Sequence, residues 1–221
     1  MSRISRKPRK SWRGRLLAAG VLLSVAFVFG GQLFLHLRPE NVGNICEIFD
    51  ARYSWYRAAR TSEERWGTPM HVQMAIMSQE SSFIFNARPP RAKLMGVIPW
   101  KRPSNAYGFA QALDDTWRWY LKDTGREHAS RDQFADAIDF IGWYTHKSNR
   151  IAGISKWDPY NQYLAYHEGQ TGWKKKSYER LPWLKERASR VDQRSRRWWG
   201  ELQVCAEDLE SRWWLMRRLL S

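Results

Sequence analysis

Apolar residues recur along most of this chain at steps of three and four, which is the spacing of one buried helix face. Strand-like alternation of any length does not appear, and neither does an internal repeat. One stretch after Gly67 carries its apolar residues on a single helical face, at Val72, Ala75, Ile76 and Phe83. The pattern therefore predicts a mainly α-helical protein.

Start and stop signals divide the first part of this pattern. Thr61 and Glu64 have the spacing of a capping box, which predicts a short helical turn over 62–66. Thr68 is expected to cap the next helix, with Pro69 at its first position. The stretch 86–105 then breaks the periodicity, because it contains four prolines and five bases. It predicts a loop or flap that is too long to be a simple connection.

Further helices are predicted in the second half of the chain. Asp114 is expected to cap one that stops at Gly125, and Asp158 with Pro159 to open another that ends at Gly169. Between them, Ser130 or Asp132 opens a helix with a buried stripe at Phe134, Ala137, Ile138 and Ile141. From Lys185 onward a long helix carries an apolar seam at Val191, Ser195, Trp198, Leu202, Cys205, Leu209, Trp213 and Met216.

The N-terminal segment follows a different pattern. Residues 1–15 hold seven Lys and Arg and no acid, and 16–37 form an uncharged apolar run. At 1.5 Å per residue this run reaches roughly 33 Å, enough for a hydrocarbon core of about 30 Å. The basic flank favours the cytoplasm. We therefore expect 1–15 to be a cytoplasmic tail, 16–37 a single-pass transmembrane signal-anchor, and 41–221 an exported domain. A cleaved signal peptide is the alternative, although the run is longer than a usual signal core.

Charge and cysteine content narrow the function classes. The net charge of +15 falls to +8 once the basic tail is set aside. A basic balance is also typical of nucleic-acid-binding proteins, but export argues against a nucleic-acid partner. Two cysteines and five scattered histidines show no metal-ligand spacing, so no cofactor or metal is expected. In an oxidising compartment we predict a Cys46–Cys205 disulfide; two buried thiols are the alternative.

Three short motifs in a fixed order carry the candidate chemistry. They are MSQESSF around Glu80, SNAYGFAQ ending at Gln111, and AYHEG over 165–169. Each is common alone, but together they resemble the catalytic core of the soluble lytic transglycosylases and their goose-type lysozyme relatives, which cut peptidoglycan glycan strands. The resemblance implies a lysozyme-like fold over 41–221 and peptidoglycan as the partner. With the anchor, it implies a bacterial inner-membrane protein whose catalytic domain is periplasmic. It names no protein partner.

Glu80 is the predicted catalytic acid/base. It shares a helical face with Ile76, Met77 and Phe83, and an apolar surrounding raises the pKa of a carboxyl group, as a general acid requires. The alternative is that Glu80 has no catalytic role and, as a glutamate at a helix end, points to water or pairs with Arg88. The resemblance implies a single essential glutamate and a 1,6-anhydro-muramyl product, which is a carbon–oxygen lyase reaction on a polysaccharide. A hydrolytic lysozyme-like muramidase and a non-catalytic glycan-binding wall scaffold are the rival functions.

The resemblance also implies five substrate-binding residues. Ser81 would support the catalytic glutamate or the sugar, and the amide of Gln111 would line a sugar subsite. Gly108 would let the backbone approach the glycan closely. The Tyr166 hydroxyl would reach the catalytic carboxyl. His167 stands where the family has Asn and also lines the site.

Two further sets of residues bear on the groove. Ala110 stands where the family has Met before its Gln, which predicts an altered wall beside the subsite. The chain has 14 tryptophans, and Trp100, Trp157 and Trp173 are candidates for stacking on sugar rings, with core packing as their alternative.

Overall fold

The computed structural model describes residues 38–220 except 92, 95–97 and 100–101, and the compact unit begins at Arg38. The predicted cytoplasmic tail and transmembrane segment, 1–15 and 16–37, lie outside the described residues. Within the part that is described, no helix has both the length and the apolarity needed to cross a membrane.

The described unit is mainly α-helical, as predicted. Two short helices, α2 (Ile45–Ala51) and α3 (Tyr53–Trp66), come first and are followed by α4 (Met70–Ser81). The second half contains α5 (Asp114–Thr124), α6 (Phe134–Ala152), α7 (Pro159–Lys174), the 3₁₀ turn η1 (Ser177–Arg180) and α8 (Pro182–Leu220). Inside the predicted loop 86–105, a two-residue ladder pairs β1 (Lys93–Leu94) with β2 (Ile98–Pro99) in antiparallel register, which the apolar pattern did not predict.

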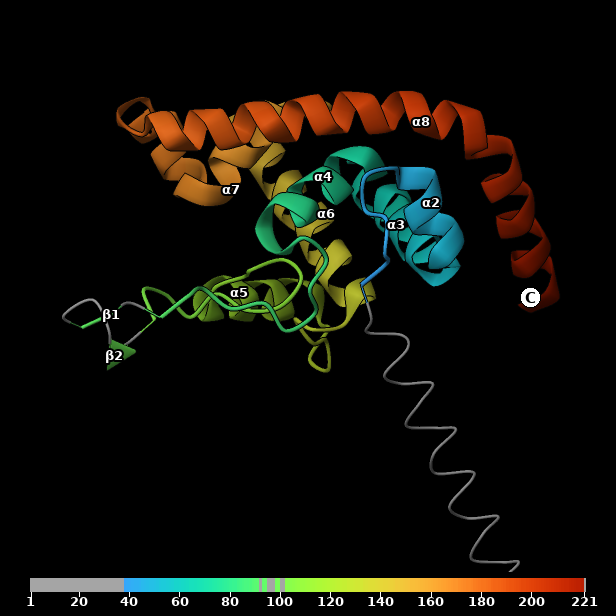
Figure 1. Cartoon of the computed structure of the whole chain (residues 1–221), viewed down its shortest axis with the longest axis horizontal. Coiled ribbons are helices and arrows are strands. Elements are labelled where there is room, and N and C mark those ends of the chain that lie inside the picture. The colour runs from blue at the N-terminus through green and yellow to red at the C-terminus, as the bar shows by residue number, and fades with distance from the viewer. Residues whose placement is uncertain (1–37, 92, 95–97, 100–101, 221) are drawn as a thin grey trace, which may run out of the picture. The chain divides into compact units, whose positions relative to one another are not determined.

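The core surrounds α4. Every side chain from Met70 to Ser78 is buried, because α4 packs against α3, α6, α7 and α8 together. The long helix α8 runs along one side of the unit, across α7, α4 and α2 (Figure 1). Its predicted apolar seam is confirmed where side chains are described, since Val191, Ser195, Trp198, Leu202, Leu209 and Trp213 are buried and Cys205 is half-buried.

Several predicted helix ends are confirmed by their backbone conformation. Gly67 and Gly125 end α3 and α5 in the left-handed region that glycine adopts without steric cost. The Asp158 carboxylate accepts the backbone N–H of Asn161 at 3.0 Å and so caps α7 as expected.

The predicted caps of two helices are displaced: Leu113 and not Asp114 is the N-cap of α5, and Gln133 is that of α6. Neither Ser130 nor Asp132 holds that position.

Three further predicted boundaries are wrong. The capping box at 61–64 is not used, because α3 continues through it and Ser62 instead bonds the Gln73 side chain inside the core. Thr68 does not cap α4, since its hydroxyl lies 2.8 Å from that of Thr145. Gly169, with φ of 72°, kinks α7 instead of ending it. In each case a tertiary contact or a continued helix overrides the local signal.

The predicted disulfide is present and ties the two ends of the described unit together. It joins Cys46 of α2 to Cys205 of α8, with Cα atoms 6.1 Å apart and 159 positions between them in sequence. Nearby, the Trp198 indole N–H donates to the Gly43 carbonyl at 3.0 Å and the Tyr53 hydroxyl donates to the Leu209 carbonyl at 3.2 Å. These contacts hold α8 across α4, where the candidate site is built.

Candidate functional site

Glu80 lies in the last turn of α4, where the helix stops. Ser82 and Phe83 follow with φ of 50° and 62°, so the chain turns sharply through two left-handed residues immediately after it. The Ser81 hydroxyl stabilises this turn, because it donates to the Met77 carbonyl at 3.3 Å and accepts the Phe83 N–H at 3.2 Å. Ser81 is thus buried in a backbone role beside Glu80, and a contact with sugar stays a prediction.

The environment of Glu80 suits an acid that works near neutral pH. The pKa of its carboxyl group is raised to about 7, because burial raises it. This effect of burial is larger than the lowering caused by a hydrogen bond from Tyr163 and by the positive charge of Arg187. Tyr163 is itself buried, and both burial and the Glu80 charge raise its pKa. Glu80 can therefore hold a proton at neutral pH and still have a donor for its ionised form.

Arg187 extends this contact to a second layer. It comes from the second turn of α8, and its guanidinium hydrogen-bonds the Tyr163 hydroxyl oxygen. A chain of contacts therefore runs from Arg187 through Tyr163 to Glu80, and it joins α8, α7 and α4. The sequence analysis predicted neither partner, because Arg187 has no local signal and Tyr163 lies just before the third motif.

The tyrosine that hydrogen-bonds Glu80 is Tyr163, about one helical turn before the predicted Tyr166. Tyr166 donates its hydroxyl to the Ala110 carbonyl at 2.6 Å, and its ring packs edge-on against Tyr144. Tyr163, three residues earlier and so on the same side of α7, makes the hydrogen bond to Glu80 instead. Tyr166 remains close enough for the Glu80 charge to contribute to its raised pKa.

A cavity of about 260 Å³ brings together three of the predicted substrate-binding residues, Gln111, Tyr166 and His167. Because Tyr166 also lies close to Glu80, it connects this cavity to the acid. The other residues that line the cavity are Ala112, Leu113, Thr116, Phe140, Tyr144, Glu168 and Gly169. The second and third sequence motifs thus meet in one hollow although more than 50 positions separate them.

Gln111 presents one half of its amide to this cavity. Its nitrogen donates to the carbonyls of Ala87 and Gly108, both at 2.9 Å, so both N–H bonds are occupied within the protein. The amide oxygen is left as the group that can accept a hydrogen bond from a ligand, and an acetamido N–H has the matching chemistry.

Gly108 has a different role from the one expected. Its φ is +78°, and a Cβ at this position would lie 2.0 Å from the Arg131 carbonyl oxygen. The neighbouring Phe109 N–H donates to that same oxygen at 3.1 Å. The close backbone approach is therefore to residue 131 of the chain itself, and it shapes the loop that carries Gln111.

His167 is exposed at the cavity edge and held from two sides. Its Nδ1 lies 3.0 Å from a Glu168 carboxylate oxygen, and its ring packs edge-on against Trp183, with centroids 5.1 Å apart. The Arg187 guanidinium lies 5.0 Å from the centroid of the Trp183 ring. Trp183 is 43% exposed and therefore offers an aromatic surface near the cavity that sequence reasoning missed.

Two of the three tryptophans proposed from sequence, Trp157 and Trp173, do not line this cavity. The indole N–H of half-buried Trp173 donates to Asn161 at 3.0 Å. Trp157 is exposed, but it packs with His71 and Trp199 around a separate cavity of about 210 Å³. The side chain of Trp100 lies outside the described residues.

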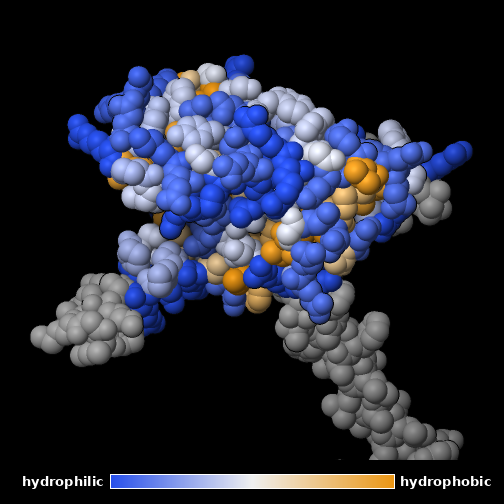
Figure 2. Space-filling view, turned by 45° about the horizontal axis from the view of Figure 1, so that its top comes forward, coloured by the Kyte–Doolittle hydropathy of each residue, from blue (hydrophilic) through white to orange (hydrophobic). Residues whose placement is uncertain are grey.

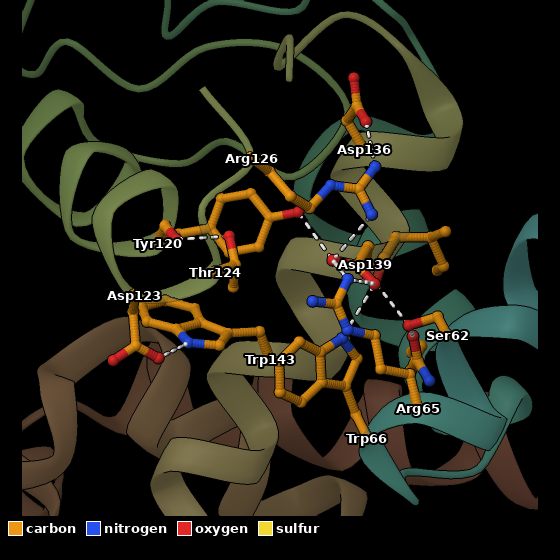
Figure 3. Close-up of polar contacts among 12 residues, drawn as sticks. Ser62, Arg65, Trp66, Tyr120, Asp123, Thr124, Arg126, Asp136, Asp139 and Trp143 are labelled. Atoms are coloured by element: carbon orange, nitrogen blue, oxygen red, sulfur yellow. Dashed lines mark hydrogen bonds and ion pairs between the residues drawn. The ribbon is translucent and has the colours of Figure 1, made fainter. Parts of the chain in front are cut away.

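A second cavity, of about 310 Å³, is also lined by a carboxylate, that of Asp139. The polar contacts of Asp139 are drawn in Figure 3 and indicate a structural role. Asp139 is 4% exposed and accepts the Trp66 indole N–H at 2.9 Å and the Tyr120 hydroxyl at 2.7 Å. Arg65 and Arg126 each lie 3.4 Å from it. All these contacts give the Asp139 carboxylate a structural role between helices.

Comparison with known proteins shows the family of this chain. A family model described as "transglycosylase SLT domain" matches residues 17–205, which is most of the chain. The chain belongs to the transglycosylase SLT domain family. No curated protein and no solved structure gives a significant match. This is the lytic transglycosylase and lysozyme-like family that the three motifs indicated, and the matched range includes Glu80, Tyr163 and Arg187.

Within the described residues, no group of three or more His, Cys, Asp or Glu side chains is placed to hold a metal ion.

Proposed function

We propose that this protein is a membrane-anchored peptidoglycan lytic transglycosylase. It cleaves the β-1,4 bond between N-acetylmuramic acid and N-acetylglucosamine and leaves a 1,6-anhydro-muramyl end. The observation that carries the proposal is the placement of Glu80 in an SLT domain: a half-buried carboxyl group whose pKa lies at about 7, beside the cavity that contains Gln111 and Tyr166.

In the first step, protonated Glu80 donates its proton to the glycosidic oxygen as the C1–O bond breaks. The carbonyl oxygen of the substrate's own N-acetyl group attacks C1, so no protein nucleophile is required. Glu80 is now ionised. The Tyr163 hydroxyl, itself hydrogen-bonded by Arg187, stabilises this carboxylate.

In the second step, the Glu80 carboxylate removes the proton from the C6 hydroxyl. The C6 oxygen then bonds to C1 as the acetamido oxygen leaves, which closes the 1,6-anhydro ring and regenerates protonated Glu80. No water is consumed. The Gln111 amide oxygen is oriented to accept the N–H of an acetamido group, which supports recognition of the N-acetylated substrate.

The test is mass spectrometry of purified peptidoglycan digested by the full chain in water enriched in oxygen-18. We expect 1,6-anhydro ends, one water lighter than hydrolytic ends, without label. A digest dominated by labelled reducing ends would replace the proposal with a muramidase.

The position of Glu168 supports a second candidate function, hydrolysis of the glycan. This carboxylate lines the same cavity, and a hydrogen bond from the Ser177 hydroxyl lowers its pKa, so it is ionised at neutral pH. Many glycoside hydrolases use such a second carboxylate. If Glu168 were the base or nucleophile, Glu168→Gln would lose about 10²–10⁴ in rate; under the transglycosylase proposal the variant stays within a few-fold of wild type.

The location is part of the proposal. Residues 16–37 would anchor the protein in the bacterial inner membrane, with the SLT domain in the periplasm. Protease treatment of spheroplasts would test this: the domain should be digested from outside, and protection of it would exclude this orientation.

A further inference from the structure

Helix α8 carries two flanks of different charge, one on each side of its buried seam. On one flank lie Arg187, Arg190, Arg194 and Arg197, each one position before a buried seam residue. Their steps of three, four and three place them in one line along the helix, about 15 Å long. We call Arg190, Arg194 and Arg197 the arginine stripe; Arg187, at its end, belongs to the Glu80 site. The α8 face that Figure 2 turns toward the viewer is mostly hydrophilic.

The stripe lies on the Glu80 side of α8. Arg187 reaches Tyr163 and Glu80 at one end. Farther along, the Arg194 guanidinium lies 5.9 Å from the centroid of the Trp198 ring, which is 6.3 Å from the ring of Phe83. Phe83 follows Glu80 by three positions, so the stripe continues from the acid along the turn that ends α4.

Positive charge on this flank is only partly balanced among the described residues. Arg190 pairs with Glu186 at 2.5 Å and Arg197 with Glu201 at 3.5 Å, and both guanidinium groups remain accessible, with side chains 45% and 58% exposed. Arg194 has no ion pair with a described acid, whereas the charge of Arg187 acts on Glu80. The arginine stripe therefore holds three arginines against two glutamates.

Arg194 is the residue in this flank that most needs a partner. It is half-buried, and its Nη1 has no hydrogen-bond partner in the described part of the chain. Burial, then the charges of Arg197 and Arg190, lower its pKa, so the cation is held in an unfavourable place. An anion bound beside this guanidinium would offset the repulsion between neighbouring arginines.

The opposite flank shows that this imbalance is local. Arg196 lies one position after buried Ser195 and pairs with Asp192 at 2.9 Å. It belongs to the same helix and is more exposed than the stripe, yet its charge is balanced by its own neighbour.

We propose that the arginine stripe binds the carboxylates of the stem peptides that peptidoglycan glycan strands carry, so that the site prefers peptide-bearing substrate. The inference rests on the proposed function, since it names the part of the same substrate that lies beside the bond being cut. Planar guanidinium groups match carboxylates with paired hydrogen bonds, and a line of them suits a flexible peptide with several acids.

The experiment compares kcat/KM of the full chain on two substrates: intact glycan strands with stem peptides, and strands from which an amidase has removed them. We expect wild type to prefer the first. Arg194→Gln should reduce that preference by about tenfold, as loss of one charge-assisted contact does. Arg190→Gln should reduce it less. Arg194→Lys keeps the charge and should restore part of the preference.

Arg196→Gln is the matched control, because it removes one arginine from the same helix outside the stripe, and it should leave the preference unchanged. Since Arg190 is well exposed, Arg190→Gln decides the question if Arg194→Gln does not fold. An unchanged preference in folded stripe variants would overturn the proposal. It would also be overturned if those variants lost binding to vesicles containing phosphatidylglycerol while keeping the preference, which would make the stripe a lipid site.

The proposed function and this inference can fail separately. Full-length Glu80→Gln should bind intact strands more tightly than stripped strands, and this difference should shrink when Arg194→Gln is added. If wild type cuts neither substrate, the proposed function fails, and this binding comparison still decides the role of the stripe.

Discussion

Glu80 and Asp139 are two carboxyl groups withdrawn from water on neighbouring helices, and their surroundings differ. Asp139 is the more buried of the two, but it receives an indole N–H and a tyrosine hydroxyl and lies beside two guanidinium groups. At Glu80 the effect of burial outweighs the help from Tyr163 and Arg187, and the pKa rises to about 7.

Burial alone therefore does not identify the acid. A charged carboxylate is stable inside a protein when hydrogen-bond donors replace its lost hydration. When donors replace only part of that hydration, the pKa of the carboxyl group rises and the group binds a proton more readily. The cavity of about 310 Å³ is lined by the satisfied carboxylate, whereas the cavity of about 260 Å³ lies near the proton-binding group. Four predictions test this contrast, from the largest expected effect to the smallest.

The largest effect is expected for Glu80→Gln. The amide has nearly the same shape but cannot supply a proton, so cleavage of purified peptidoglycan should fall by about 10²–10⁴. Binding of the variant to the wall should persist, as measured by co-sedimentation. Activity within a few-fold of wild type would exclude Glu80 as the acid.

Asp139→Ala should act on stability instead of chemistry. It leaves the Trp66 and Tyr120 donors and two guanidinium groups without their shared acceptor, so the free energy of unfolding should fall by about 3–5 kcal/mol. Urea denaturation measures this. Asp123→Ala is the control. Asp123 also accepts a tryptophan N–H, from Trp143, and pairs with Lys147, but its side chain is 33% exposed, so about 1 kcal/mol is expected. Equal losses would remove the contrast between a buried and an exposed carboxylate.

Glu80→Gln should also stabilise the fold in a pH-dependent way. The folded state binds the Glu80 proton with a pKa of about 7 and the unfolded state with the ordinary 4.5, so wild-type stability falls as pH rises between these values. Glutamine does not titrate. The variant should therefore gain about 3 kcal/mol over wild type between pH 4.5 and pH 8. A stability difference that is flat across this range would mean that the acid is not perturbed.

Tyr163→Phe should produce the smallest change, a shift in the pH profile. The hydroxyl lowers the Glu80 pKa, so its removal raises that pKa and moves the loss of activity at high pH upward, by about one unit. Tyr166→Phe provides the comparison, because its hydroxyl donates to Ala110 and not to Glu80; it should alter KM without moving the profile. A shift in the second variant alone would restore the tyrosine assignment made from sequence.

Prediction from sequence succeeded where short-range physics dominates. The helical periodicity, the glycine ends at Gly67 and Gly125, the Asp158 cap and the seam of α8 all depend on neighbours within a few residues. It failed where a distant segment competes for the same group. Ser62 and Thr68 have the side chains of helix caps, yet both form hydrogen bonds across the core.

The candidate site divides in the same way. The sequence alone placed Glu80 on an apolar helical face, from which a raised pKa follows, and the three ordered motifs placed Gln111, Tyr166 and His167 in one family pattern. It also supplied two cysteines, which the structure joins.

Which tyrosine meets the acid, what Gly108 avoids and where the α8 arginines lie were decided only by the tertiary structure. Tyr163 and Tyr166 share one side of α7, so the choice between them depends on where α4 and the loop at Ala110 approach that helix. Arg187 is more than 100 positions from Glu80, and only the packing of α8 across α4 and α7 brings its charge to the acid. Helix periodicity determines which face is buried, but the partner against that face is set by contacts that no local pattern encodes.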